Sequence, residues 1–322
     1  MDTVTSTRTQ TPPRPRAVVD TASAAAKVIL LGEHAVVHGR PALAAGLPDG
    51  LRLRAHELPA ATDTARLTIP AWDLDLALEA ASEHPVSRAA LAVLAHCDGP
   101  VRGVHIEGTA AVPARAGLGS SAALCVALAR LVLGDEAPRA HLLAAAHEGE
   151  RVFHGAPSGI DAHVACSGGL VRFMRGQNAT PVITSVPLEL VIVPTGVARQ
   201  TAAQVERVRA RLQRHPTVVT PILDTLGAAT DAGIRAVESG DLAALGELLN
   251  IAGHALEALG VGHPALREVC DIARASGALG AKLTGAGAGG CAIALVPQDE
   301  TDAVQSRLRD RGWSPLHARI TS

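Results

Sequence analysis

The sequence predicts an α+β protein built from two domains. Its 322 residues are enough for two domains of average size. The last third of the chain is expected to run strand, helices, strand, helix, strand, an order typical of helices packed on one face of a sheet. Hydrophobic residues make up 48% of the chain, but it has only two Trp, two Phe and no Tyr, so its cores must be aliphatic.

Strands and helices alternate through the first half of the chain. A hydrophobic period of two predicts strands, and a period near 3.6 predicts helices. Pro85 and Pro138 suit helix starts, where a backbone N–H has no partner to lose. The predicted strands cover residues 27–31, 35–37, 42–47, 51–58, 101–110 and 168–172, and the predicted helices cover 86–96, 121–134, 137–154 and 160–165.

The second half is predicted to be mostly helical. Its strands are expected at 188–196, 291–296 and 317–320, and its helices at 201–214, 218–237, 242–258, 266–276 and 298–312. We place the domain boundary near residues 184–187. The chain then divides into a disordered tail (1–18), an N-terminal domain (19–186) and a C-terminal domain (187–322).

Composition excludes several classes of function. The net charge is −2, so no basic field would hold nucleic acid, and aromatic residues for stacking on bases are scarce. No apolar run reaches the roughly 18 residues of a membrane span. The N-terminus lacks the apolar segment of a secretory signal, and the five cysteines form no C-x-x-C pair. We therefore expect a cytoplasmic protein with reduced thiols that binds neither nucleic acid nor membrane.

A glycine-rich loop with two serines, PARAGLGSS, covers residues 113–121 and precedes a predicted helix. Unpaired N–H groups and partial positive charge at a helix start suit a phosphate, and glycines let it approach the backbone. The alternative is that Ser120 caps the helix and the glycines only form a turn. Local sequence leaves both interpretations open, although the Walker A pattern is excluded.

A second glycine cluster, GAGAGG at residues 285–290, matches the letters of a dinucleotide-binding fingerprint. That fingerprint requires a strand before the glycines and a helix after them. Here a helix is expected before them and a strand after them, so dinucleotide binding is rejected. Two interpretations of this cluster remain: a tight turn, or a backbone lid near a phosphate site.

Acidic and basic side chains supply candidates for proton transfer. Asp161 follows Ser158 by three residues, so it either belongs to a capping box or acts as a general base. Lys27, one of only two lysines with Lys282, would keep that base ionised. Glu148 and Glu150 lie on opposite sides of one helix, so only one of them should enter a site.

The two histidines of GEHAVVHG, His34 and His38, lie four residues apart in a predicted strand and turn. Because helical ligand spacing does not apply there, we expect no zinc site.

Three motifs together resemble those of the GHMP small-molecule kinases. The first is KVILLGEHAVVHG (27–39), the second PARAGLGSSAA (113–123) and the third KLTGAGAGG (282–290). They occur in the family's order and span most of the chain, which is far more specific than one glycine loop. The segments GEHAVVHG, ERVFHGAPSGID, ALGVGHPALREVC and VARQTAAQVERVRARL resemble the branch that phosphorylates mevalonate.

The resemblance implies a two-domain GHMP kinase fold. Its N-terminal α/β domain would be like that of a ribosomal protein, its C-terminal α+β domain would be ferredoxin-like, and the site would lie between them. ATP and Mg²⁺ are implied, with Mg²⁺ on Ser121 and Glu150. The ATP-binding residues would be Gly117, Leu118, Gly119, Ser120, Ser121, Gly285 and Gly287.

The resemblance also implies roles at the reacting end. Asp161 would take the proton of the C5 hydroxyl of mevalonate, and Lys27 would stabilise the charge that develops. The residues near the mevalonate end would be Glu33, His34, Arg199 and Thr201. A homodimer is expected by analogy.

Three other functions remain alternatives on the sequence. The first is another GHMP kinase, acting on phosphomevalonate or a sugar. The second is a catalytically silent ligand sensor of the same fold, although a sensor does not need a base such as Asp161. The third, a nicotinamide-dependent oxidoreductase, rests on the 285–290 cluster alone and fails because strand and helix are expected there in the wrong order.

Overall fold

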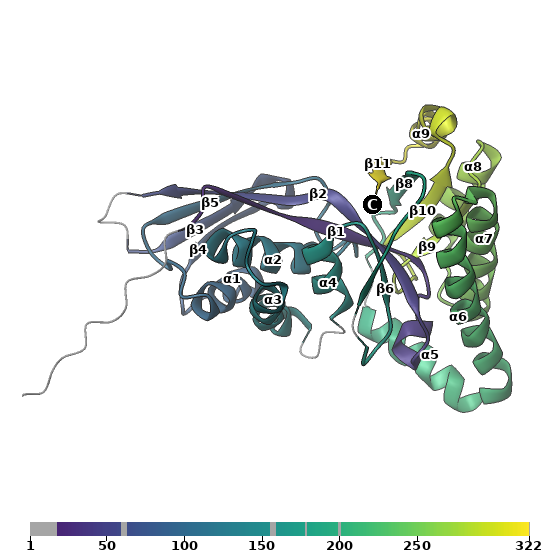
Figure 1. Ribbon diagram of the computed structural model, residues 1–322, viewed down its shortest axis with the longest axis horizontal. Helices are drawn as coiled ribbons and strands as arrows, with labels where there is room; N and C mark the ends of the chain where they lie inside the picture. Colours follow the sequence, from purple (N-terminus) through teal and green to yellow (C-terminus); the bar gives the residue numbers. More distant parts are fainter. Residues whose placement is uncertain (1–17, 59–62, 155–158, 178, 199–200, 322) are drawn as a thin grey trace, which may run out of the picture.

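The structure is a computed structural model that describes residues 18–58, 63–154, 159–177, 179–198 and 201–321. Its strands form two sheets, and a separate group of helices covers each (Figure 1). The tail predicted for residues 1–18 lies outside the described residues except for Val18. The first sheet ends at Val182 and the second begins at Leu188, and we keep 184–187 as the proposed domain boundary.

The first sheet is antiparallel except where β3 pairs with β5. Its longest strand, β2, pairs with β1 along one edge and with both β5 and β6 along the other. This leaves the outer edge of β1 without a neighbouring strand in this sheet. The strands are β1 (Thr21–Leu31), β2 (Ala42–Glu57), β3 (Ala65–Ile69), β4 (Leu74–Leu78), β5 (Val104–Ala110), β6 (Leu170–Phe173) and β7 (Thr180–Val182).

Four helices lie on one face of the first sheet (Figure 1), where α1, α2 and α4 contact its strands and α3 packs on those three helices. Most of α2 is buried because its sequence, SSAALCVALARLVL, is apolar after the two serines except at Arg130. Gly134 ends α2, as the sequence predicts. The helices are α1 (Pro85–His96), α2 (Ser120–Leu133), α3 (Arg139–His154) and α4 (Ile160–Ser167).

The second sheet is antiparallel, with the order β11-β8-β10-β9. Its strands are β8 (Leu188–Pro194), β9 (Gly280–Thr284), β10 (Cys291–Val296) and β11 (Leu316–Ile320). Its helices are α5 (Thr201–Arg214), α6 (Pro216–Ser239), α7 (Leu242–Ala258), α8 (Pro264–Ala275) and α9 (Thr301–Asp310). In the described part of the chain, no helix is both long and apolar enough to cross a membrane.

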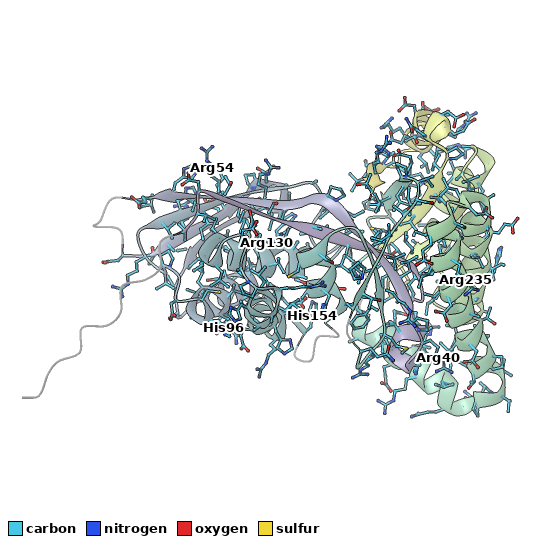
Figure 2. The ribbon with its side chains drawn as sticks, viewed as in Figure 1. Arg40, Arg54, His96, Arg130, His154 and Arg235 are labelled. Carbon is cyan, nitrogen blue, oxygen red and sulfur yellow. The ribbon has the colours of Figure 1, made fainter. Side chains whose placement is uncertain are left out.

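Strand β1 belongs to both halves of the molecule. Ala22 and Ala24 pack in a core with α1, α2 and α3, whereas Val28 and Leu30 pack in a core with β8, β10, α6 and α7. An ion pair of 2.8 Å between Arg40, which Figure 2 labels, and Asp224 of α6 adds a surface contact between the halves. The second half of β1 therefore lies where the two sheets meet.

Several sequence predictions were wrong in detail. Residues 35–37, expected as a strand, lie in a 3₁₀ turn, η1 (Ala35–His38), because positive φ at Gly32, His34 and Gly39 bends the chain there. The strands β3, β4, β7 and β9 and the turns η2 (Pro70–Trp72) and η3 (Gln298–Glu300) were not predicted. Strand β9 precedes the 285–290 cluster, so this cluster turns from strand to strand.

The structure confirms two expectations about composition and motifs. All five cysteines are free and buried. A strand, not a helix, follows the 285–290 cluster, so the rejection of a dinucleotide-binding fingerprint stands.

Candidate active site

An ion pair between Lys27 and Asp161 lies at the centre of the candidate site. The distance from Lys27 Nζ to Asp161 Oδ1 is 2.8 Å. The lysine side chain is 7% exposed, while the aspartate is 30% exposed and so reaches solvent. Asp161 is in the first turn of α4, where Gly159 occupies the N-cap position that a capping box would give to Ser158. Ser158 itself lies outside the described residues. The Asp161 carboxylate remains available to accept a proton.

The glycine loop lies directly against the strand that carries Lys27. The Lys27 N–H donates to the Leu118 carbonyl at 2.7 Å. Gly119 has a φ of +72°, and a Cβ on it would lie 3.3 Å from the Lys27 Cβ. Only glycine combines that conformation with so close an approach. The loop therefore brings the start of α2 beside Lys27.

Helix α2 begins with its two serines half-buried and near the end of α3. Gly119 occupies the N-cap position, and no side chain caps the helix, so the interpretation of Ser120 as a cap is wrong. The Ser121 hydroxyl lies 3.3 Å from Nε2 of His154, which stands at the end of α3 (Figure 2). The unpaired N–H groups at this helix start are a ready site for an anion.

Of the two glutamates on α3, only Glu150 points inward. Helix geometry predicts that just one of them does so, and the motif resemblance implies that it is Glu150. Glu150 is 2% exposed, while Glu148 is 40% exposed and pairs with Arg151 on the surface. Burial, together with the nearby Asp161 carboxylate, raises the pKa of Glu150 from 4.5 to about 8, and Lys27 partly opposes this. His154 is one helical turn beyond Glu150, which places the Ser121 hydroxyl near the same face of α3.

These groups fit a magnesium ion. A buried carboxylate beside a second carboxylate is poorly stabilised, and a bound cation would remove the repulsion between them. The carboxylate and hydroxyl oxygens of Glu150 and Ser121 are the hard donors that Mg²⁺ prefers. No group of three or more His, Cys, Asp or Glu side chains in the described residues could hold a metal by itself.

The third motif forms the hairpin turn between β9 and β10. Gly285 and Gly287 both have positive φ, and a Cβ on Gly287 would lie 2.2 Å from the Val261 carbonyl. The turn touches the N-terminal half twice: His34 Nε2 lies 3.0 Å from the Ala286 carbonyl, and Cys291 Sγ donates to the Ala116 carbonyl at 3.2 Å. The third motif thus borders the loop at 113–121, and its contact with ATP stays a prediction.

The residues expected near the substrate lie in different environments. Glu33 is fully buried and pairs with Lys282 of β9, whereas Thr201 is exposed at the start of α5. His34 is buried in the turn after β1 with a φ of 59°. Arg199 lies outside the described residues. Glu33 therefore binds the lysine of β9 and does not face an open space, whereas His34 lies beside the third motif.

The Glu33–Lys282 pair joins the two halves of the molecule, and both side chains are fully buried. Burial raises the pKa of Glu33 and lowers that of Lys282, and each charge partly offsets this shift in the other. Within the described residues, the second carboxylate oxygen of Glu33 has no hydrogen-bond partner. A charge buried in this way depends on its partner.

We expect Lys282→Met to lower the free energy of unfolding by about 3–5 kcal/mol, because it leaves the Glu33 carboxyl buried without its cation. Urea unfolding measures this loss. The double variant Glu33→Gln/Lys282→Met removes both charges and should recover part of it. Equal stability of Lys282→Met and the wild type would contradict a dependence on the pair.

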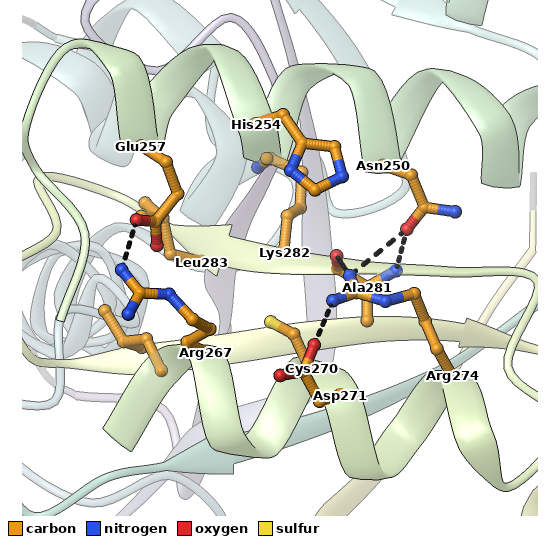
Figure 3. A pocket seen from close by; sticks show the side chains of 12 residues that line it. Asn250, His254, Glu257, Arg267, Cys270, Asp271, Arg274, Ala281, Lys282 and Leu283 are labelled. Carbon is orange, nitrogen blue, oxygen red and sulfur yellow. Dashed lines mark hydrogen bonds and ion pairs between the residues drawn. The ribbon is translucent and has the colours of Figure 1, made fainter. Parts of the chain in front are cut away.

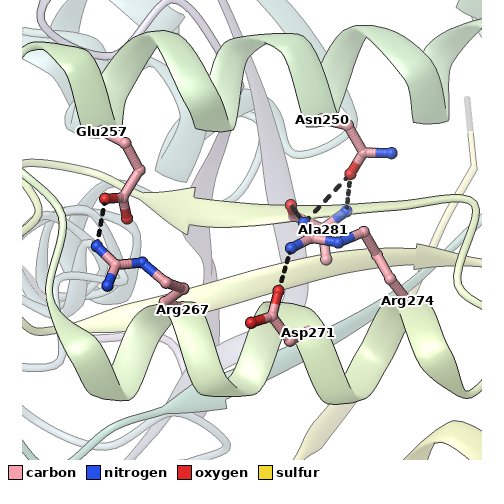
Figure 4. Close-up of polar contacts among 6 residues, drawn as sticks. All are labelled: Asn250, Glu257, Arg267, Asp271, Arg274 and Ala281. Atoms are coloured by element: carbon pink, nitrogen blue, oxygen red, sulfur yellow. Dashed lines mark hydrogen bonds and ion pairs between the residues drawn. The ribbon is translucent and has the colours of Figure 1, made fainter.

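A pocket of about 130 Å³ lies between α7, α8 and β9 (Figure 3). Its charged side chains bind one another: Arg267 pairs with Glu257, and Arg274 pairs with Asp271 (Figure 4). Its walls include Lys282 but not Lys27, Glu150 or Asp161. This pocket is therefore separate from the candidate active site.

Sequence reasoning missed two residues of the site region, His154 and Thr284. His154 could have been found from its spacing of four residues from Glu150 on a predicted helix. The contact of Thr284 with Ile29 crosses 255 positions of the chain and has no local signal.

Comparisons with known proteins agree with this geometry. Residues 84–169 match the family model described as "GHMP kinases N terminal domain", and residues 234–312 match "GHMP kinases C terminal". The mevalonate kinase of Pyrococcus furiosus is 34% identical over 93% of this chain and 96% of its own length. The mevalonate kinase of Homo sapiens is 34% identical over 92% of both chains.

Solved structures give the same result. The L. major mevalonate kinase in complex with R-mevalonate has a TM-score of 0.85 at 27% identity, and the match covers 97% of this chain and 99% of that one. The Lactococcus lactis galactokinase complexed with galactose has a TM-score of 0.72 at 21% identity over 94% of both chains, which shows a shared fold. The protein is therefore an enzyme with a two-domain GHMP kinase fold, and the chain belongs to the GHMP kinase family, within its mevalonate kinase branch.

Proposed function

We propose that the protein transfers the γ-phosphoryl group of ATP to the C5 hydroxyl of mevalonate and so produces 5-phosphomevalonate. The observation that carries this proposal is the Lys27–Asp161 pair, which lies beside the glycine loop at the start of α2. A carboxylate held by a lysine next to an anion site suits transfer of a phosphoryl group to an alcohol.

The described residues divide the chemistry between them. Asp161 accepts the hydroxyl proton as the substrate oxygen bonds to phosphorus and the bond to ADP breaks. Lys27 orients Asp161 and stabilises negative charge on the transferring group. Residues 117–121 hold the ATP phosphates through backbone N–H groups. Mg²⁺, which Ser121 and Glu150 would hold, supplies further positive charge at the phosphates when it is bound.

Mevalonate is the substrate that the comparisons favour. Curated relatives at about 34% identity over nearly the whole chain are mevalonate kinases. His34 and Thr201, with Arg199 beyond the described residues, are our candidates for contacts with mevalonate. The burial of Glu33 favours an indirect role there, in which it holds the turn that carries His34.

An ADP-release assay with mevalonate, phosphomevalonate and galactose tests the proposal. We expect release with mevalonate alone, and ³¹P NMR of the product should show one phosphate monoester on C5. Faster release with either other substrate would assign the protein to a different GHMP kinase activity. No release with any of them would favour a silent sensor. The Asp161→Asn variant controls for contaminating kinases.

A further inference from the structure

We propose that Thr284 is a positioning residue, whose hydroxyl fixes the segment of β1 that carries Lys27 against the glycine loop. The Ile29 N–H donates to Thr284 Oγ1 at 2.9 Å, and the same hydroxyl donates to the Ile29 carbonyl at 3.0 Å. One side chain from the second sheet thus satisfies both backbone groups of a residue in the first sheet.

The Thr284 hydroxyl bonds backbone groups of β1 that a neighbouring strand would otherwise bond. Among the described residues, no strand of the first sheet lies on the outer edge of β1, so the backbone groups there need other partners. The Lys27 N–H finds one in Leu118 of the glycine loop, and Ile29, two residues further, finds one in Thr284. Alternate residues of a strand direct their N–H groups to the same edge. The same edge of β1 is therefore held at Lys27 by the glycine loop and at Ile29 by Thr284.

The surroundings make the contact difficult to replace. Thr284 is 3% and Ile29 is 8% exposed, so water is not at hand to satisfy the backbone groups if the hydroxyl is lost. Lys282, two residues before Thr284 on β9, pairs with Glu33 beyond the end of β1. Two alternate side chains of β9 thus bind the segment after Lys27: Thr284 binds Ile29, and Lys282 binds Glu33. A shift of β1 relative to β9 would move Lys27 relative to both Leu118 and Asp161.

The kinetic test rests on the proposed function and uses isosteric variants. Thr284→Val removes the hydroxyl and should lower kcat about 10- to 100-fold, because small displacements of reacting groups cost rates of this size. Thr284→Ser keeps the hydroxyl and should restore most of the activity. Thr230→Val is the matched control: Thr230 is equally buried, but its hydroxyl bonds to the Leu226 carbonyl within α6.

A double variant separates positioning from a general loss of stability. If Thr284 acts through Lys27, Thr284→Val should have little further effect on kcat in the Lys27→Met background. A full additional loss in that background would overturn the proposal, as would equal kcat values for Thr284→Val and Thr230→Val. Thr284→Ala provides the same comparison if the valine variant does not fold.

The two lysines of the chain allow a test that needs no activity. Labelling with ¹⁵N-lysine gives backbone amide signals from Lys27 and Lys282 alone, and Lys27→Met assigns them. Thr284→Val should shift the Lys27 signal, because its hydrogen bond to Leu118 changes, whereas Thr230→Val should leave it in place. An unmoved Lys27 signal would refute the positioning role even in an active enzyme. If no variant phosphorylates mevalonate but the signal shifts, the proposed function fails and this inference remains.

Discussion

Replacing Asp161 with asparagine is expected to lower kcat by about 10²–10⁴-fold, the usual contribution of a general base. Asparagine has nearly the same shape, so it can still contact Lys27, but it cannot accept the proton of the substrate hydroxyl. The KM for ATP should change little, since the glycine loop and α2 do not depend on this carboxylate. Steady-state kinetics with mevalonate and ATP measures both values.

A second aspartate provides the control. Asp75 forms an ion pair with Arg66 on the surface of the first sheet, so Asp75→Asn also removes a carboxylate from a basic partner. It should leave kcat unchanged, because exposed pairs contribute little even to stability. If Asp161→Asn kept kcat within a few-fold of the wild type, Asp161 would be a structural partner of Lys27, and the base would have to be sought elsewhere.

Much of the fold could be predicted because its signals are local. The helices of the second half follow the hydrophobic period closely, and α5 and α7 have the predicted bounds. The turn at residues 35–38 was misjudged because AVVH is apolar and β-branched, while positive φ at Gly32, His34 and Gly39 overrides that preference. Short strands such as β7 have too few residues to show a period.

The candidate site could be predicted only in part. Motif resemblance suggested that Lys27 and Asp161 would be partners, and the structure places their charged atoms 2.8 Å apart. Helix geometry predicted that only one of Glu148 and Glu150 would enter the site, and the motif resemblance implied that it would be Glu150. By contrast, the contacts of β9 with β1 join residues about 250 positions apart, so no local pattern reveals that Lys282 pairs with Glu33. Such contacts follow from how the two sheets dock.

Glu150→Gln is expected to stabilise the ligand-free protein at alkaline pH while abolishing most of its activity. The pKa of Glu150 is about 8 in the folded protein, against an ordinary value of 4.5. Between these values the folded protein keeps a proton that the unfolded chain has lost, so stability falls as the pH rises from 4.5 to 8. Glutamine is neutral and has no such loss. Above pH 8 it should be the more stable protein by roughly 4 kcal/mol.

Thermal or urea unfolding of both proteins at pH 5 and pH 8.5 measures this difference. The curves should nearly coincide at pH 5 and separate at pH 8.5, and Glu148→Gln, an exposed change two residues away, should follow the wild type at both values. Adding Mg²⁺ and ATP at pH 8.5 should raise the stability of the wild type more than that of Glu150→Gln. If the two unfolding curves did not separate at pH 8.5, burial would not raise the pKa of Glu150 as this prediction requires.

The stability and the activity of Glu150→Gln together test the role of Glu150. In the ligand-free protein we expect this carboxylate to lower the stability at alkaline pH, because it lies buried beside Asp161, and Lys27 only partly compensates its charge. If residue 150 only supported the fold, glutamine at this position would raise the stability without any loss of activity. Loss of activity in that more stable variant would therefore point to a role that requires negative charge, and a cation bound between α2 and α3 is the partner that such a charge would have.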